Sequence, residues 1–161
     1  MDIKTLYENI NDYIGKTVIL KGWIRNHRKQ KEFGFIDFSD GTCFKSLQLV
    51  YDNSLDSFDK IQKYRIGSAI EVVGKLVSSE GKEQAYELKV LSVTLLGDSP
   101  EDYPIQPKKH SREFLREQAY LRPRTNLFQA VFRVRSLAAH AIHTYFQERG
   151  YVSTKYVWLY Q

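Results

Sequence analysis

Residues 32–40 read EFGFIDFSD, with three phenylalanines in nine positions. In a β-strand successive side chains point to opposite faces, so Ile36 and Phe38 share one face while Phe35 and Asp37 share the other. The first face is apolar and suits a protein core. The second face carries an aromatic ring beside a carboxylate, which suits either a second apolar contact or a platform for a flat ligand.

Runs of the same type lie on both sides of this one. Residues 16–27 (KTVILKGWIRNH) and 44–52 (FKSLQLVYD) flank it, and residues 68–79 and 85–98 follow. Each is rich in β-branched and aromatic side chains and is bounded by Gly, Asp, Asn or Ser. The composition therefore predicts five strands.

Two helical patterns accompany the strands. The N-terminal segment IKTLYENINDYIG carries apolar residues at helical spacing and ends at Gly15, which predicts a short amphipathic helix. A second helix is predicted within residues 54–67, between the third and fourth strands. This mainly β order is that of an OB-fold, a small five-stranded barrel that binds oligonucleotides on one face.

The sequence changes character after Gly97. Residues 98–111 (DSPEDYPIQPKKHS) hold three prolines and no usable periodicity, which predicts a linker or hinge. Ser111 then caps a short helix, and residues 125–150 keep apolar side chains on one helical face and end at glycine, which predicts a long helix. The predicted organisation is a barrel domain at 1–98, a hinge at 99–124 and a further region at 125–161.

The composition is that of an ordinary globular protein, with 161 residues, 42% hydrophobic and 27% charged. No apolar run is long enough to cross a membrane and the N-terminus has no signal-peptide pattern, so we expect a cytoplasmic protein. Cys43 is the single cysteine, and His140 and His143 on the long helix have no third ligand nearby in sequence. We therefore expect no metal, no catalytic group and no cofactor site in this chain.

The net charge of +5 comes from residues 101–161, and residues 1–100 are neutral overall but contain a local cluster of cations. Five cations and no acid occur within residues 21–31, namely Lys21, Arg25, Arg28, Lys29 and Lys31. A cluster of this kind is either a solvated strand end or a contact for a polyanion.

Strand alternation gives the predicted barrel an inside and an outside. The inside set is Val18, Leu20, Ile24, Ile36, Phe38, Leu47 and Leu49. The outside set is Lys21, Trp23, Arg25, Phe35, Asp37, Ser46 and Gln48. The outside set combines aromatic rings, an amide and cations, which single-stranded RNA needs for base stacking, for hydrogen bonds to a base edge and for its phosphates.

A purely structural role is open for these outer residues as well. Phe35 can cover the barrel flank, with Phe33 packed under the N-terminal helix, and an exposed glutamine such as Gln48 is common. Trp23 next to Gly22 suits packing against the N-terminal helix, because the glycine can mark a bulge.

Three segments together resemble a known family. They are residues 22–52 (GWIRNHRKQKEFGFIDFSDGTCFKSLQLVYD), 103–126 (YPIQPKKHSREFLREQAYLRPRTN) and 133–151 (RVRSLAAHAIHTYFQERGY). They are similar to the N-terminal third of bacterial-type asparaginyl-tRNA synthetases, class IIb enzymes in which an OB-fold anticodon-binding domain is joined by a hinge to a catalytic domain. The motifs DGTCF, YPIQ, HSREFLRE and LRPRTN look asparaginyl rather than aspartyl or lysyl.

The resemblance implies roles for three residues. Phe35 matches the family phenylalanine that stacks on the central anticodon base, a uridine in this group, and Gln48 matches the glutamine that reads the same base. Arg28 matches a basic residue at the anticodon loop. The implied partner is a tRNA with an asparagine-type anticodon loop. The complete family enzymes are homodimers that attach asparagine to this tRNA with ATP and Mg²⁺.

The sequence departs from the family at its C-terminal end. After Val152 it reads STKYVWLYQ, which lacks the proline-containing strand of the dimer-interface element called motif 1. Motifs 2 and 3, which hold ATP, do not occur. We therefore expect the incomplete start of a class II catalytic domain at 125–161, a truncated or frameshifted reading frame, no catalysis by this chain alone, and self-association through the motif 1 helix.

Other functions fit the same residues. One is a freestanding OB-fold module that binds single-stranded nucleic acid with little preference for an anticodon loop. A second is the anticodon domain of an aspartate-type synthetase. A third is an interaction fragment that pairs with a full-length synthetase through the long helix.

Overall fold

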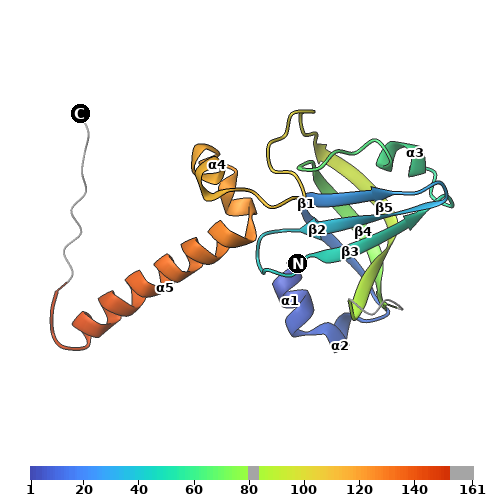
Figure 1. The fold of residues 1–161 in the computed structure, drawn as a ribbon. Helices are drawn as coiled ribbons and strands as arrows, with labels where there is room; N and C mark the ends of the chain where they lie inside the picture. The colour runs from blue at the N-terminus through green and yellow to red at the C-terminus, as the bar shows by residue number, and fades with distance from the viewer. Residues whose placement is uncertain (80–83, 153–161) are drawn as a thin grey trace. The chain divides into compact units, whose positions relative to one another are not determined.

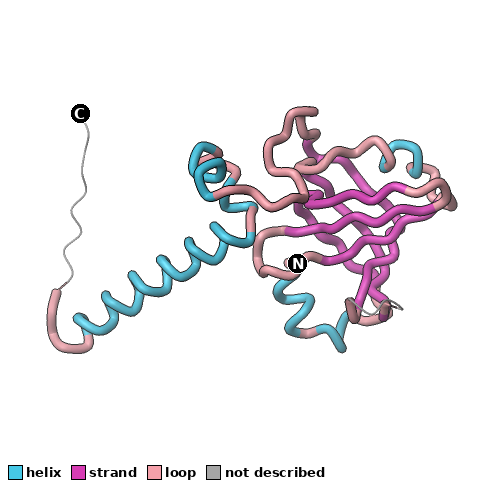
Figure 2. The backbone as a smooth tube through the Cα atoms, viewed as in Figure 1, coloured by secondary structure: helices cyan, strands magenta, loops and turns pink. Residues whose placement is uncertain are grey.

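The computed structural model describes residues 1–79 and 84–152. The chain divides into two compact units, Met1–Ala119 and the part from Tyr120 onward. The first unit holds all the strands of the described residues, and the second holds the longest helix (Figure 2).

Five strands of the first unit close into a barrel (Figure 1). They are β1 (Thr17–Lys29), β2 (Phe33–Ser39), β3 (Leu47–Asp52), β4 (Ala69–Ser78) and β5 (Tyr86–Gly97). Their order around the barrel is β1-β2-β3-β5-β4. Neighbouring strands are antiparallel except β3 and β5, which are parallel. The expected five-stranded barrel is confirmed.

Alternation along these strands sorts the side chains into an apolar interior. All seven predicted inside residues are buried, with exposed fractions between 0% and 4%. Tyr51 joins them at 1%, and its ring lies so close to the Cα of Gly34 that a Cβ there would overlap it. Removing such apolar surface from water contributes roughly 25 cal/mol per Å² to stability. The barrel interior is therefore the main source of stability in the first unit.

Two short helices precede the barrel where the sequence predicted one. α1 (Ile3–Glu8) and α2 (Ile10–Tyr13) are separated at Asn9, whose φ of −122° and ψ of 38° are not helical. The side-chain amide nitrogen of Asn9, Nδ2, donates to the carbonyl oxygen of Thr5 at 3.0 Å. Asparagine side chains compete with the backbone for such bonds and favour helix ends over helix interiors. Gly15 then ends the segment with a φ of 78°, as the glycine stop predicted.

Two aspartates hold the N-terminus of α1. Asp2 Oδ1 accepts a hydrogen bond from the Thr5 amide at 2.7 Å. Asp40, in the loop between β2 and β3, accepts from the Ile3 amide through Oδ2 at 2.7 Å. Because the first amides of a helix have no partner within it, both carboxylates stabilise the start of α1, and Asp40 also joins the helix to the barrel.

The helix between β3 and β4 is shorter than its apolar spacing suggested. α3 (Phe58–Ile61) has only 4 residues, and turns make up most of the remaining segment. Its apolar side chains still reach the core, because Ile61 is fully buried and the Phe58 ring lies 5.6 Å from that of Tyr51.

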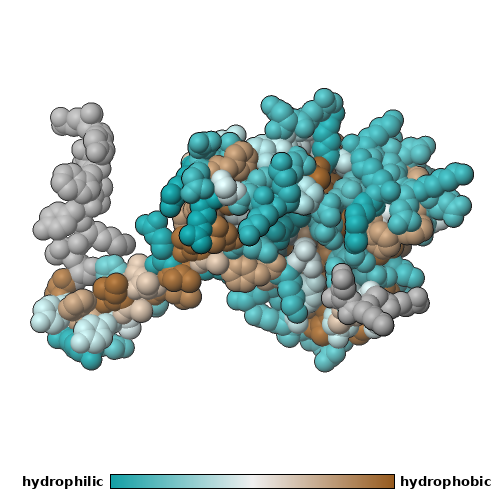
Figure 3. All heavy atoms as spheres, viewed as in Figure 1, coloured by the Kyte–Doolittle hydropathy of each residue, from teal (hydrophilic) through white to brown (hydrophobic). Residues whose placement is uncertain are grey.

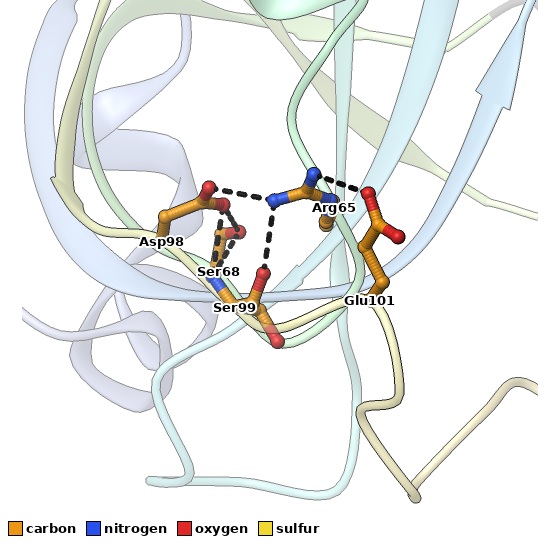
Figure 4. Close-up of polar contacts among 5 residues, drawn as sticks. All are labelled: Arg65, Ser68, Asp98, Ser99 and Glu101. Carbon is orange, nitrogen blue, oxygen red and sulfur yellow. Dashed lines mark hydrogen bonds and ion pairs between the residues drawn. The ribbon is translucent and has the colours of Figure 1, made fainter.

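The segment after β5 packs on the barrel rather than standing off as a hinge. Ser99 and Tyr103 are buried, and Arg65 forms ion pairs with Asp98 at 2.9 Å and with Glu101 at 3.0 Å (Figure 4). α4 (Arg112–Glu117) follows, capped by Ser111 as predicted. The first compact unit therefore extends to Ala119 and includes most of residues 99–124, the region for which the sequence suggested a hinge.

Within residues 120–152, the described part of the second unit, the chain forms a 3₁₀ turn and a long helix. The turn is η1 (Arg122–Arg124) and the helix is α5 (Asn126–Gln147), which Thr125 caps. The Arg122 guanidinium lies over the Phe128 ring at 5.0 Å and over the Phe132 ring at 5.6 Å. Figure 3 shows hydrophobic side chains gathered along α5, among them Val134, Leu137 and Ile142, which are 59% to 69% exposed. The divergent tail at 153–161 lies outside the described residues.

Among the helices of the described ranges, none combines the length and the apolar character that a membrane span requires.

Candidate nucleic-acid interface

The three residues singled out by the sequence lie together on the outer face of β1, β2 and β3. Arg28 pairs with Phe35 across β1 and β2, and Asp37 pairs with Gln48 across β2 and β3. Arg28 donates from Nη2 to Gln48 Oε1 at 2.8 Å, and its guanidinium carbon lies 5.1 Å from the centre of the Phe35 ring. We call Arg28, Phe35 and Gln48 the outer triad.

A bulge in β1 brings Arg28 to this face. Strict alternation from the buried Ile24 would place Arg28 on the inside. The register between β1 and β2 shifts between Ile24 and Asn26, which reverses the alternation beyond that point. His27 therefore points inward, toward Tyr51, and Arg28 points outward. The predicted role of Gly22 as a bulge marker is not what the structure shows, because the irregularity follows it and Gly22 instead accommodates the Phe38 ring.

The Phe35 ring is half-buried and contacts a second phenylalanine ring edge-to-face. Phe33 lies 5.4 Å from it, centre to centre, with the two planes at 86°. This edge-to-face contact is favourable and restricts the rotamer of both rings. Phe33 is 37% exposed and sits at the start of β2, whereas α1 bonds to Asp40 beyond the end of that strand. Phe33 thus supports the outer triad and does not pack under the N-terminal helix.

The amide of Gln48 is held from two sides. Its oxygen accepts from Arg28, and its nitrogen donates to Glu87 Oε2 at 3.5 Å. Glu87 lies on β5, directly opposite Gln48 in the parallel pairing, and also accepts from Ser79 Oγ at 3.1 Å. Sequence reasoning missed Glu87. Alternation along residues 85–98 places it on the outer face, but no local signal shows that β5 pairs with β3.

Beneath this face, His27 is neutral at pH 7. Nε2 accepts a hydrogen bond from the Tyr51 hydroxyl at 2.6 Å, and Nδ1 lies 3.1 Å from the Tyr64 carbonyl oxygen. Because a carbonyl only accepts, Nδ1 carries the proton. Burial lowers the pKa of His27 to about 4, against the raising effect of the Tyr64 bond, and burial raises the pKa of Tyr51 to about 12. The positive charge near the face therefore comes from arginine and lysine.

Other residues of the predicted outer set are occupied elsewhere. Lys21 forms an ion pair with Glu71 of β4 at 3.0 Å. Trp23 lies beside Gly41 of the β2–β3 loop. Cys43, which is not part of that set, is half-buried and its thiol donates to the Lys45 carbonyl at 3.2 Å. No group of three or more His, Cys, Asp or Glu in residues 1–79 and 84–152 is arranged to hold a metal ion.

Comparison with known proteins identifies the barrel. Residues 18–96 match the tRNA anti-codon family, described as an OB-fold nucleic acid binding domain. In solved structures the fold is found in asparaginyl-tRNA synthetase from Pyrococcus horikoshii complexed with asparaginyl-adenylate, with a TM-score of 0.75, 23% identity, and coverage of 87% of this chain and 33% of that one. It is also found in aspartyl tRNA synthetase from Entamoeba histolytica, with a TM-score of 0.79, 17% identity and coverage of 94% and 38%. At these identities the likeness concerns the fold.

The curated relatives of higher sequence identity are asparagine--tRNA ligases. The asparagine--tRNA ligase of Acholeplasma laidlawii is 56% identical over 153 residues, which are 94% of this chain and 33% of that protein. The asparagine--tRNA ligase of Clostridium tetani is 50% identical over 152 residues, with coverage of 94% and 33%. The chain thus spans about a third of the length of these relatives. It corresponds to the N-terminal third of asparaginyl-tRNA synthetases, with an OB-fold nucleic-acid-binding domain at residues 18–96.

Proposed function

We propose that the outer triad binds the anticodon loop of a tRNA of asparagine type. The observation that carries this proposal is the convergence of Arg28, Phe35 and Gln48, from three different strands, on one face of an OB barrel. The face offers a ring for stacking, an amide for base reading and a cation. These are the three contacts by which proteins recognise unpaired RNA bases.

Phe35 is the stacking platform for the central anticodon base. Its ring contacts Phe33 edge-to-face and is half-buried on the barrel exterior, with the Arg28 guanidinium over it at 5.1 Å, so a base stacks on the ring beside this guanidinium or in its place. Stacking of this kind contributes about 1–3 kcal/mol per base. Stacking alone does not select uridine, since every base has a π face, so selection needs a polar group beside the ring.

Gln48 supplies that polar group. Its amide can accept two hydrogen bonds and donate two. Arg28 uses one acceptor site and Glu87 uses one hydrogen, which leaves one of each beside Phe35. A uracil edge presents a ring N–H next to a carbonyl oxygen, and this complements the remaining donor and acceptor. A cytosine in the same position turns its ring nitrogen, an acceptor, toward the Gln48 oxygen. Because Arg28 and Glu87 hold the amide in one orientation, it does not turn over to pair with the cytosine amino group, and facing acceptors are costly once water is excluded.

The same proposal has consequences for a longer enzyme. The relatives are asparagine--tRNA ligases, so we infer that the longer enzyme joins asparagine to its tRNA, and the reaction of that class uses ATP and Mg²⁺. Those groups, the homodimer and a cytoplasmic role in translation belong to the proposal for the whole protein. In this chain, we infer no catalytic residue and assign it the anticodon-binding part.

Binding to a tRNA with a GUU anticodon tests the proposal, compared with a tRNA whose central U is changed to C. We expect the wild-type chain to prefer U, and Phe35→Ala to weaken binding about 5- to 150-fold, which corresponds to the loss of one stacked base. Phe44→Ala is the matched control, because Phe44 is an exposed phenylalanine of the β2–β3 loop outside the outer triad. Equal binding of both tRNAs, unaffected by Phe35→Ala, would leave a general single-strand-binding module as the better description.

A further inference from the structure

A pocket of about 340 Å³ lies beside β1, away from the outer triad. Its lining comes from three segments that are distant in sequence: the end of β1, the turn before β4, and the segment after β5. The lining residues used below are His27, Lys29, Tyr64, Pro100, Glu101 and Tyr103. All belong to the first compact unit.

The pocket exists because β1 is longer than its partner β4. β4 pairs with β1 from Thr17 to Trp23, and past that point β1 keeps β2 as its strand partner. The Ile24 backbone bonds to Gly67 and Ser68, which starts the turn before β4 along this edge. The turn before β4 and the segment after β5 both lie next to β1 (Figure 1). The edge of β1 near Lys29 is therefore flanked by two walls.

Side-chain hydrogen bonds and ion pairs join the two walls of the pocket. Arg65 bonds to Asp98, Glu101 and the Ser99 carbonyl, and Ser68 bonds to Asp98 (Figure 4). These bonds tie the turn before β4 to the segment after β5. The pocket accordingly has a fixed shape set by a network of side chains.

The charges of the pocket leave one cation unpaired. Arg65 is paired with two carboxylates, those of Asp98 and Glu101. His27 has both ring nitrogens engaged by Tyr64 and Tyr51. Lys29 is exposed, and among the described residues no carboxylate forms an ion pair with it. A ligand that places an anionic group at Lys29 and a flat, partly apolar group against Tyr64 and Pro100 fits this lining.

The pocket is continuous with the outer triad through β1. Arg28 faces the outer triad, and Lys29, the next residue, faces the pocket. Adjacent strands lie about 4.8 Å apart, so only β1 separates a base stacked on Phe35 of β2 from the pocket edge. A strand of RNA that crosses β1 at Arg28 arrives at Lys29.

We propose that this pocket receives an unpaired nucleotide of the same RNA loop, one outside the three anticodon positions, with its phosphate at Lys29 and its base against Tyr64 and Pro100. This inference rests on the proposed anticodon binding and extends it. The pocket gives the chain a contact with the loop that does not depend on which anticodon is present.

Fluorescent labelling of the loop tests the proposal in the full chain. 2-Aminopurine is placed, one position at a time, at each unpaired nucleotide outside the anticodon of a GUU stem–loop. We expect the fluorescence at one position to change on binding and to change less with Lys29→Glu or Tyr64→Leu. Lys29→Glu is also expected to lower the slope of log affinity against log salt by about 0.7, the value for one single-strand phosphate.

Lys75→Glu is the matched control, because it makes the same charge change at an exposed lysine of β4. A thermal melt of Tyr64→Leu checks that this variant folds, and Lys29→Glu carries the test if it does not. If no label responds and Lys29→Glu behaves as Lys75→Glu, while Phe35→Ala still removes the preference for U, the pocket proposal is overturned and anticodon binding stands. If Phe35→Ala has no effect either, both are overturned.

Discussion

The guanidinium group of Arg28 donates a hydrogen bond from Nη2 to Oε1 of Gln48 at 2.8 Å, across a sequence separation of 20 residues. Since β2 lies between the strands that carry these residues, the bond crosses it, and Phe35 sits directly beneath the arginine. One side chain, that of Arg28, therefore contacts both the reading amide and the stacking ring. Charge and geometry at Arg28 can be separated by substitution.

Arg28→Ala is expected to weaken binding of the GUU stem–loop about tenfold, because a hydrogen bond to a charged group is worth about 1.5 kcal/mol at the low end of its range. Arg28→Lys keeps the charge but not the planar donor that reaches both neighbours. It should recover affinity without recovering the preference for a central U. Anisotropy titrations with U and C stem–loops measure both quantities. A lysine variant with the wild-type U-to-C ratio would show that Arg28 acts only as a charge.

Asp40→Ala is expected to lower the free energy of unfolding by about 1–2 kcal/mol, the usual cost of losing a helix cap. Asp40 accepts from the Ile3 amide and also from the Thr42 amide and hydroxyl, so its loss frees α1 and the β2–β3 loop together. Urea denaturation provides the measurement. Asp56→Ala, at an exposed aspartate before α3, is the control and should leave the midpoint in place.

Gly67→Ala and Gly15→Ala form a matched pair. Both glycines have positive φ, 89° and 78°, but a Cβ at Gly67 would lie 2.8 Å from the Tyr103 ring and Ser99 Oγ, whereas none of the surrounding atoms lies within 4 Å at Gly15. We expect Gly15→Ala to cost about 1 kcal/mol for the backbone alone. Gly67→Ala should cost a further 1–3 kcal/mol, roughly, for overpacking. Equal urea midpoints for the two variants would mean that the segment after β5 moves away from the added methyl group at no cost in stability.

The stability of the barrel should fall as the pH drops from about 6.5 to about 4. His27 has a lowered pKa of about 4 in the folded chain, because it is buried, against an ordinary value of 6.5 when unfolded. Between these values the unfolded chain binds a proton that the folded chain does not. The free energy of unfolding therefore decreases with falling pH, with a limiting slope of about 1.4 kcal/mol per pH unit for one proton.

Urea denaturation at pH 7 and at pH 5 measures this effect. His27→Gln should flatten the dependence in that window, although it also loses stability at pH 7. His140→Gln, at an exposed position on α5, should keep the wild-type dependence. Below this window Asp98 adds a loss of the same sign, because the Ser99 amide holds the pKa of that carboxyl below its usual value. A His27→Gln variant as sensitive to pH as the wild type would assign the effect to other groups.

The barrel was predictable because its strands alternate cleanly. Every residue assigned to the inside from Val18 to Leu49 is buried, and Phe35 and Gln48 lie on the opposite face as expected. Arg28 was not predictable from alternation. Its outward position depends on the bulge between Ile24 and Asn26, and the resemblance to the synthetases supplied it.

Contacts between segments distant in sequence could not be predicted from local patterns. Three prolines after Gly97 favoured a free hinge. In the structure Arg65 bonds to this segment, and the absence of a side chain at Gly67 lets Tyr103 and Ser99 approach the barrel closely. Similarly, the apolar spacing at residues 54–67 suggested a full helix where only α3 forms. Local periodicity reports which face of an element is buried, and it does not report which remote residue will meet it.

The parallel pairing of β3 with β5 determines when the reading face comes into being. Gln48 and Glu87 are opposite one another in this pairing, yet 39 residues separate them along the chain. As the polypeptide is synthesised, Phe35 and Arg28 emerge early, but the Gln48 amide acquires its second hydrogen-bond partner, Glu87, only when β5 has been added. A nascent chain that ends before β5 has the Phe35 ring but lacks the second hydrogen bond that fixes the Gln48 amide. Base discrimination therefore requires a closed barrel and becomes possible only late in synthesis.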